Sequence, residues 1–313
     1  MSKISIIGAG NVGATCANAI AHMNYASEII LLDIKQGFAE GKATDMMQSA
    51  KQYGFDCNIK GITNDYKATE KSDIVVVTSG IPRKPGMTRE ELIGVNAGIV
   101  KEVIENVLKH SPKAVIIIVS NPMDTMTYLA NKITNLPQGR IFGMGGALDS
   151  SRFRYYLSNE LGCAQSDIQC TVIGGHSDTT MVPLISKATL AGEPVTNLLK
   201  KDKLEEIKHN TMIGGATLTR MLNTSAWYAP GSSIAMMCKS IILDQKKIFP
   251  CSVYLNGEYN QKDICIGVPA MIGKKGIEKI MNFTLTEEEK EAFNKSAEAV
   301  KKTNSVLHDM NLI

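Results

Sequence analysis

The residues that indicate a chemical function most clearly are one histidine and the charged side chains that precede it. His176 follows a pair of glycines, and upstream of it Asp149 and Arg152 stand three residues apart. Histidine exchanges a proton near neutral pH, a carboxylate orients its ring, and a guanidinium pairs with a carboxylate. Two more arginines, Arg83 and Arg89, stand earlier in the chain. This combination indicates oxidation or reduction at the alcohol or carbonyl carbon of a small dianionic acid.

Each of these residues also has a simpler interpretation. His176 alone could be an ordinary loop residue, and Asp149 with Arg152 could form a surface ion pair that contributes little. Arg83 and Arg89 could belong to a solvated basic loop. The catalytic interpretation is favoured because all of them occur together.

A glycine-rich segment near the start of the chain predicts a dinucleotide site. Residues 3–7 are short and β-branched, as in a buried strand, and a small-residue helix is expected from the glycines to about His22. Between them lies G-x-G-x-x-G, formed by Gly8, Gly10 and Gly13. Asp33 follows 20 residues after Gly13, where its carboxylate can bind ribose hydroxyls and would repel a 2′-phosphate, so NAD is expected. The alternative is a glycine turn in a flavodoxin-like domain without a dinucleotide.

Continuous apolar runs predict an α/β fold with a Rossmann-type, doubly wound parallel sheet. They span residues 28–32, 73–79, 114–119 and 140–144. Ligands bind at the carboxyl ends of such strands. Asp33, Ser79 with Gly80, and Asn121 all stand at those ends.

The second part of the sequence has shorter strand-like segments and is expected to form an α+β substrate and catalytic domain. We therefore divide the chain into residues 1–145 and 146–313. Helices are expected over 148–161, 203–222 and 231–244, and strands over 168–173, 251–255 and 263–268. Asn256-Gly257 is a hairpin signal, and Thr286 with Glu289 forms a capping box before a C-terminal helix.

Composition excludes several functional classes. A net charge of +3 over 313 residues gives no reason to expect nucleic acid or a membrane surface as partner. No apolar run reaches the ~18 residues of a membrane span, and no metal motif is present. The seven cysteines contain no CxxC pair and are expected to be free thiols. Because the first residues lead directly into a strand, no signal peptide is expected, and the cytoplasm is the expected compartment.

Taken in order, the motifs resemble the lactate/malate dehydrogenase family, and within it the lactate-dehydrogenase-like branch of the malate dehydrogenases. The resemblance covers essentially the whole chain. The motifs that carry it are Gly8-Ala9-Gly10-Asn11-Val12-Gly13, Ile81-Pro82-Arg83-Lys84-Pro85-Gly86-Met87-Thr88-Arg89, Val119-Ser120-Asn121-Pro122, Leu148-Asp149-Ser150-Ser151-Arg152 and Gly174-Gly175-His176.

The resemblance implies a role for each matching residue. His176 would be the acid/base, oriented by Asp149, and Arg152 would bind the substrate's C1 carboxylate. Arg89, from a mobile loop over residues 81–92, would approach the substrate oxygen. Arg83 would meet the distal carboxylate of malate or oxaloacetate, at a position where lactate dehydrogenases typically carry glutamine.

The resemblance further implies contacts around the cofactor and the pocket. Asn121 would lie near the nicotinamide or the substrate oxygen, and Ser225 would match a helix segment that lines the substrate pocket. The cofactor contacts implied are Gly8, Gly10, Asn11, Val12, Gly13, Asp33, Ser79, Gly80, Asn96, Val119 and Asn121. The segment after His176 departs from many relatives, which leaves its backbone geometry open.

The expected function is NAD-dependent interconversion of malate and oxaloacetate by a homodimer or homotetramer. Two alternatives stay open at this point. One is a lactate or other 2-hydroxyacid dehydrogenase, and the other is a catalytically silent NAD-binding sensor or scaffold.

Overall fold

A computed structural model describes residues 2–82 and 86–313 of the chain. Its first half alternates strands and helices, as the apolar runs predict. The elements are β1 (Lys3–Ile7), α1 (Asn11–Met23), β2 (Glu28–Asp33), α2 (Phe38–Gln48), α3 (Ala50–Tyr53), β3 (Asn58–Thr63), β4 (Ile74–Val77), α4 (Arg89–His110), β5 (Val115–Ile118), α5 (Met123–Lys132) and β6 (Ile141–Gly143).

The second half begins with a helix and continues into mostly antiparallel structure. Its elements are α6 (Gly146–Leu161), β7 (Ile168–Gln169), β8 (Val172–Gly174), β9 (Met181–Pro183), β10 (Thr189–Leu190), β11 (Glu193–Pro194), α7 (Val195–Leu198), α8 (Lys201–Leu222), α9 (Tyr228–Ile242), β12 (Lys247–Asn256), β13 (Lys262–Gly273), β14 (Gly276–Ile280) and α10 (Glu287–Asp309).

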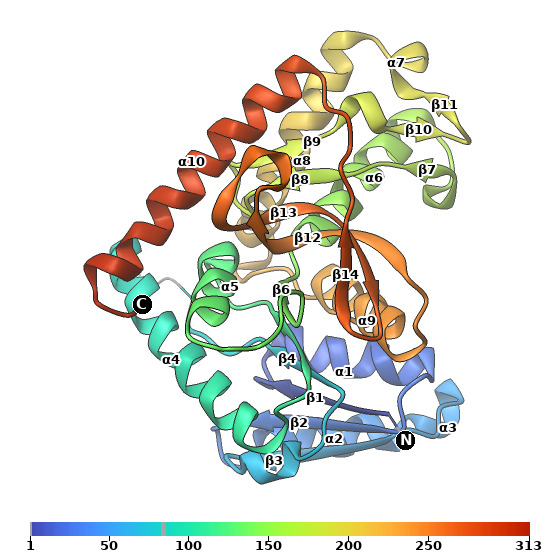
Figure 1. The fold of residues 1–313 in the computed structure, drawn as a ribbon. Helices are drawn as coiled ribbons and strands as arrows, with labels where there is room; N and C mark the ends of the chain where they lie inside the picture. Colours follow the sequence, from blue (N-terminus) through green and yellow to red (C-terminus); the bar gives the residue numbers. More distant parts are fainter. Residues whose placement is uncertain (1, 83–85) are drawn as a thin grey trace.

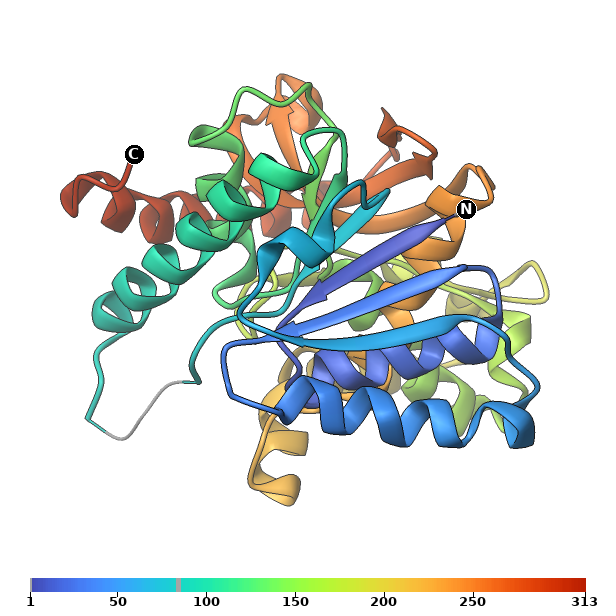
Figure 2. The ribbon, with the colours of Figure 1, turned by 90° about the horizontal axis from the view of Figure 1, so that it is seen from below.

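The parallel part of the main sheet has the strand order β3-β2-β1-β4-β5-β6, which is the doubly wound Rossmann arrangement. β4 and β5 consist of β-branched residues that are all buried, because helices cover both faces of the sheet. Figure 2 shows α1 and α2 on one side of the strands and α4 on the other. The expected fold class is therefore confirmed.

The second half extends the main sheet and also forms a small separate sheet with the strand order β11-β10-β7. β6 pairs with β12 through Gly143 and Ser252, and the order continues through β13, β8 and β9. β8 ends at Gly174, two residues before His176. In Figure 1, α10 descends from this second half to lie beside α4 and α5. The capping box of Thr286 and Glu289 at its start is confirmed.

Several boundaries differ from those expected. β3 and β14 were not predicted, because neither contains a continuous apolar run. The expected loop over 81–92 ends at Thr88, since residues from Arg89 onward form the first turn of α4 under a Thr88–Glu91 capping box. The hairpin after Asn256 exists, but a 3₁₀ turn lengthens the connection and the return strand starts at Lys262. The part of the chain that the structure describes has no helix long and apolar enough to cross a membrane.

Candidate active site

A cavity of about 570 Å³ lies at the carboxyl ends of β1, β4 and β5, where the sequence predicts the site. It continues toward α6, the loop after β8 and the connection between α8 and α9. The fold thus brings together residues that are far apart in the sequence. Predicted site residues that line the cavity are Val12, Gly80, Asn96, Val119, Asn121, Arg152, His176 and Ser225.

The glycine motif has the geometry that a dinucleotide loop requires. A Cβ on Gly13 would lie 1.9 Å from the carbonyl oxygen of Gly8, so only glycine allows α1 to pack this closely on the strand end. Gly8 itself has a φ of +107°. A Cβ on Gly10 would meet no atom of the described residues within 4 Å, which leaves open space beside the backbone. The loop is therefore tightly packed at Gly8 and Gly13 and open at Gly10.

The start of α1 and Asp33 lie next to the glycine motif. α1 begins at Asn11 with Gly10 as its N-cap, and it has neither a capping side chain nor an acidic residue in its first turn. Such a helix start offers free N–H groups and a positive dipole end to a phosphate. Asp33 accepts hydrogen bonds from the backbone N–H groups of Ala9 (2.7 Å) and Lys35 (3.0 Å) and so holds the loop.

Asn96 joins two segments at the cavity's edge. Its Oδ1 accepts from the N–H of Ile81 (2.8 Å), and its Nδ2 donates to the carbonyl of Asn121 (2.7 Å). Asn121 precedes a cis peptide bond to Pro122. Ser79 faces the other way, donating from its hydroxyl to the carbonyl of Ile7 (3.0 Å). Asn96 thus positions the strand ends that hold Gly80 and Asn121, whereas Ser79 supports the sheet.

His176, Asp149 and Arg152 form one hydrogen-bonded group. The Nδ1 of His176 lies 2.8 Å from Asp149 Oδ2, and the Nη1 of Arg152 donates to Asp149 Oδ1 at 3.1 Å. The exposed fraction of the three side chains is 16%, 2% and 13%, respectively. Asp149 is buried, and both of its carboxylate oxygens are paired. Because Asp149 binds Nδ1 of His176, Nε2 is the ring nitrogen left for proton exchange.

This environment favours the protonated form of His176. Burial opposes the imidazolium, but the charge and hydrogen bond of Asp149 outweigh burial, and the pKa of His176 is raised above its usual 6.5. Arg152 acts in the opposite direction and Asp124 adds to the increase. The imidazole is therefore suited to deliver a proton to a carbonyl oxygen near neutral pH.

Arg152 is placed to receive an anion. Its side chain packs against Gly214 and Gly215 of α8, where a Cβ would lie 3.4 Å from the guanidinium or its stem. Its Nε is buried and has no hydrogen-bond partner among the described residues. A buried guanidinium with an unused N–H is costly unless a ligand accepts from it. Ser225 lines the same cavity, although it lies in the α8–α9 loop rather than in a helix as expected.

Arg89 stands at the start of α4 and turns toward α10. Its Nη2 donates to Thr303 Oγ1 at 2.9 Å. With His176 it lines a small cavity of about 70 Å³ between α10 and residues 176–180, which we call the catalytic loop because they include the predicted acid/base. Its placement against a substrate oxygen remains a prediction. Arg83, the expected partner of a second carboxylate, lies outside the described residues.

The segment after His176 forms a compact turn. The N–H of Thr180 donates to the carbonyl of Ser177 (2.9 Å), and the two hydroxyls lie 2.6 Å apart. The backbone N–H of His176 donates to Asp124 Oδ2 at 2.6 Å. Sequence reasoning missed Asp124, although a carboxylate in the helix turn directly after Asn121-Pro122 was a visible signal.

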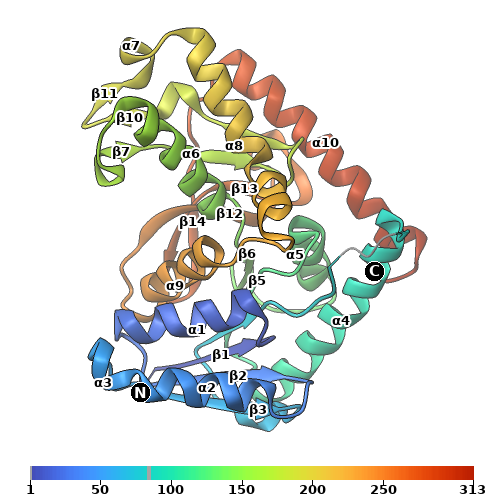
Figure 3. The same cartoon turned by 180° about the vertical axis from the view of Figure 1, so that it is seen from behind.

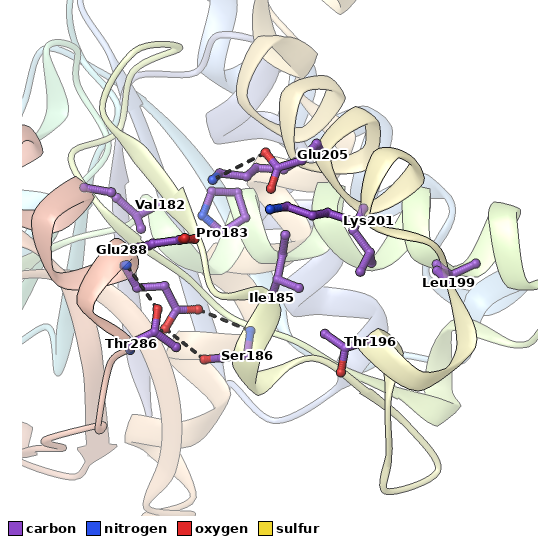
Figure 4. A pocket seen from close by; sticks show the side chains of 14 residues that line it. Val182, Pro183, Ile185, Ser186, Thr196, Leu199, Lys201, Glu205, Thr286 and Glu288 are labelled. Carbon is purple, nitrogen blue, oxygen red and sulfur yellow. Dashed lines mark hydrogen bonds and ion pairs between the residues drawn. The ribbon is translucent and has the colours of Figure 1, made fainter.

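A second cavity, of about 360 Å³, lies between α8, the start of α10 and the turn after β9 (Figure 4). Two pairs of its polar residues contact each other: Glu289 accepts from the hydroxyl and N–H of Ser186, and Lys208 lies 3.7 Å from Glu205. Figure 3 shows this end of α8 and α10 far from the glycine loop at the start of α1. The predicted site residues within the described chain do not line it, so it is not the candidate active site.

Comparison with known proteins identifies the family. Residues 2–143 match the NAD binding domain of lactate/malate dehydrogenase, and residues 146–308 match its alpha/beta C-terminal domain. The malate dehydrogenase of Parabacteroides distasonis is 60% identical over 313 residues, which are 100% of both chains. The malate dehydrogenase structure from Salinibacter ruber is similar with a TM-score of 0.94 and 40% identity, covering 99% of this chain and 98% of that one. The structure of the lactate dehydrogenase of Cryptosporidium parvum, solved with lactic acid and β-nicotinamide adenine dinucleotide, is similar with a TM-score of 0.93 and 35% identity. The match covers 98% of each chain. The chain therefore belongs to the lactate/malate dehydrogenase family.

Proposed function

We propose that this protein catalyses the reversible, NAD-dependent interconversion of (S)-malate and oxaloacetate. The observation that carries the proposal is that His176 and Arg152, both hydrogen-bonded to Asp149, line one cavity with Val12 of the glycine motif. An acid/base and a carboxylate-binding guanidinium beside a dinucleotide loop suit a 2-hydroxy acid. The full-length similarity to malate dehydrogenases favours malate within that class.

In this mechanism His176 moves the proton. Its imidazolium donates to the carbonyl oxygen of oxaloacetate in reduction, and its neutral imidazole accepts the hydroxyl proton of malate in oxidation. Asp149 holds the ring through Nδ1 at 2.8 Å and stabilises the positive charge while it exists. The raised pKa of His176 keeps the proton available for reduction at neutral pH.

The arginines bind and orient the acid. Arg152 would pair with the C1 carboxylate, which satisfies its unused Nε and fixes the reacting carbon. Arg89 would stabilise charge on the substrate oxygen, which requires it to leave the Thr303 hydroxyl that it now contacts. Arg83, proposed from the sequence alone, would meet the second carboxylate that oxaloacetate has and pyruvate lacks.

The residues at the glycine loop fit NAD. The uncapped start of α1 and the open face of Gly10 would hold the pyrophosphate, and Asp33 would bind the adenosine ribose and exclude a 2′-phosphate. NAD, when bound, supplies the carbon that takes or gives the hydride. Gly80, Asn96 and Asn121 shape the cavity wall at the strand ends.

We also propose a cytoplasmic homodimer or homotetramer. The seven cysteines are free thiols, mostly buried, which suits a reducing compartment. Large apolar side chains are exposed on α8 and α9, with Met221 at 74% and Tyr228 at 72%. Exposed apolar groups of this size are typical of surfaces between subunits.

The proposal is tested by following NADH oxidation with oxaloacetate and with pyruvate in parallel, for the wild type and Arg83→Gln. We expect a strong preference for oxaloacetate that shifts toward pyruvate in the variant, because glutamine leaves no charge for the distal carboxylate. Equal or higher rates with pyruvate in the wild type would favour a lactate dehydrogenase, the second candidate supported by the Cryptosporidium parvum neighbour. Loss of both activities with intact NADH binding would favour the silent NAD-binding protein.

A further inference from the structure

A second carboxylate, Asp124, lies buried directly behind the catalytic histidine. It stands in the first turn of α5, two residues after the cis bond that follows Asn121. Only 7% of Asp124 is exposed. A buried carboxyl is costly unless its neighbours compensate for the lost water, so its contacts need an explanation.

The contacts of Asp124 lead to the catalytic loop. Its Oδ2 accepts the backbone N–H of His176 at 2.6 Å, across 52 residues of sequence. The start of α5 favours a negative charge at this position. Burial raises the pKa of Asp124, and the nearby hydroxyl of Ser252 in β12 acts against that increase. Asp124 Oδ1 and Ser252 Oγ are nevertheless both buried without a hydrogen bond to the residues that the structure describes.

The backbone around His176 is closely packed. A Cβ on Gly145 would lie 3.1 Å from the Cβ of His176. On the other side of the loop, Gly175 donates its N–H to Ser296 of α10 (2.8 Å). The N–H of His176 itself is held by Asp124. The carboxylate thus connects the backbone of the acid/base to the strand end that presents Asn121.

We propose that Asp124 is a positioning residue for proton transfer: its carboxylate fixes the backbone of His176 against the Asn121-Pro122 turn. The inference rests on the proposed function and extends it by one residue. Asp149 orients the imidazole ring from the side-chain end, and Asp124 fixes the same residue from the main-chain end. The two carboxylates together determine where Nε2 points in the cavity.

Charge adds to this role. Burial raises the pKa of Asp124, and the hydrogen bond from His176 and the charge on that residue act against the increase. The groups that face His176 are Asp149 and Arg152 from α6 and Asp124 from α5, with Arg89 from α4 and Asp178 lining the adjoining cavities. Removing the negative charge of Asp124 destabilises the imidazolium, so the pKa of His176 should fall.

The experiment compares Asp124→Ala and Asp124→Asn with the wild type, measuring oxaloacetate-dependent kcat, its pH profile and NADH affinity by fluorescence. The alanine variant lacks the acceptor, and a displaced acid/base should lower kcat by about 100-fold while the Kd for NADH stays within about threefold. The asparagine variant keeps an oxygen for the His176 N–H and directs its amide toward Ser252. We expect it to recover kcat to within about tenfold of the wild type, with a lower pKa in its profile.

Asp263→Ala is the matched control. Asp263 anchors the other end of α5 by accepting hydrogen bonds from Tyr128 (3.2 Å) and Lys132 (3.2 Å), without contact to the catalytic loop. It should lower the Tm and leave kcat nearly unchanged. The proposal is overturned if Asp124→Ala keeps kcat within threefold, if asparagine restores nothing, or if the pH profile of the asparagine variant is unchanged. Absence of activity in the wild type would instead contradict the proposed function.

Discussion

At the scale of single residues, Asp149 determines how readily His176 holds its proton. Its charge and its hydrogen bond raise the pKa of the imidazole against the opposing effect of burial. In Asp149→Asn that support is lost, so the pKa of His176 should fall. Reduction of oxaloacetate needs the imidazolium, and its rate should therefore decline at a lower pH than in the wild type.

The measurement is the pH profile of kcat/KM in both directions. Oxidation of malate needs the neutral ring, so its rising limb should also move to lower pH in Asp149→Asn. Loss of the correct ring orientation should lower kcat by about 100-fold or more. Limbs at the wild-type pH would show that another group controls protonation.

Arg152 carries a separate prediction, because in the proposed mechanism its guanidinium binds substrate rather than moving a proton. Arg152→Ala should remove about 3–5 kcal/mol of substrate binding, which is a loss of at least ~100-fold in kcat/KM. Arg152→Lys should restore little, since an ammonium cannot pair with both carboxylate oxygens in the same plane. NADH affinity, measured by fluorescence, should change little. A variant that loses NADH and oxaloacetate together would show that Arg152 supports the fold instead.

The prediction that His176, Asp149 and Arg152 act as one group came from their residue types together with the resemblance to the family, and the structure brings the three side chains into contact. Asp149 and Arg152 are three residues apart on one helix, so their contact follows from helix geometry. The contacts of Asp124 with His176 and of Arg89 with Thr303 span 52 and 214 residues, respectively. Such pairings depend on how α5, α10 and the catalytic loop pack, which sequence spacing does not determine.

At the scale of elements, two glycines of the motif should have different roles, Gly13 in packing and Gly10 in cofactor binding. A Cβ on Gly13 would overlap the carbonyl of Gly8, whereas one on Gly10 meets no neighbour. Gly13→Ala should therefore lower the free energy of unfolding by about 2–3 kcal/mol, as overpacking does. Gly10→Ala should leave the Tm within a few degrees and weaken NADH binding by at least ~10-fold, because the methyl group occupies the space proposed for the pyrophosphate.

Thermal melts and NADH titrations of both variants check this pair. Each variant serves as the control for the other, since both introduce a single methyl group three residues apart. If Gly10→Ala binds NADH as the wild type does, the pyrophosphate does not approach this face of the loop. If Gly13→Ala has an unchanged Tm, α1 can move away from the end of β1 without a loss of stability, and the prediction for Gly13 is wrong.

Elements with a strong hydrophobic pattern were predictable, and those on the edges were not. β4 and β5 are buried on both faces and appear in the sequence as unbroken β-branched runs. β3 forms the edge of the sheet and mixes polar residues with only two isoleucines. The start of α4 was mistaken for loop because Pro82, Pro85 and Gly86 suggested flexibility, while the Thr88–Glu91 capping box begins the helix immediately afterwards.

At the scale of the whole molecule, the two parts of the chain share the main sheet and a buried hydrophobic cluster. β6 pairs with β12, and the side chain of Tyr25 in the first half donates to the carbonyl of Ala235 in α9 at 2.6 Å. A Cβ on Gly231 would lie 2.7 Å from Thr15 of α1, so α9 packs closely on that helix. The boundary at residue 145 remains a prediction about the chain, but the buried cluster runs across it.

This shared core predicts that the chain unfolds as one unit. Separating residues 1–145 from 146–313 would expose the apolar face of α1 and the outer edge of β6, and that exposure couples the stability of the two parts. Calorimetry should give a single transition, and Gly231→Leu, which forces α9 away from α1, should lower its temperature without splitting it. The control is Gly98→Leu, because a Cβ at Gly98 meets no atom of the described residues within 4 Å. Gly192 is not used as a control site because its φ of +90° would strain a leucine. Two resolved transitions in the wild type, with one retained by an isolated 1–145 fragment, would show that the halves fold independently and that the common sheet is only a docked interface.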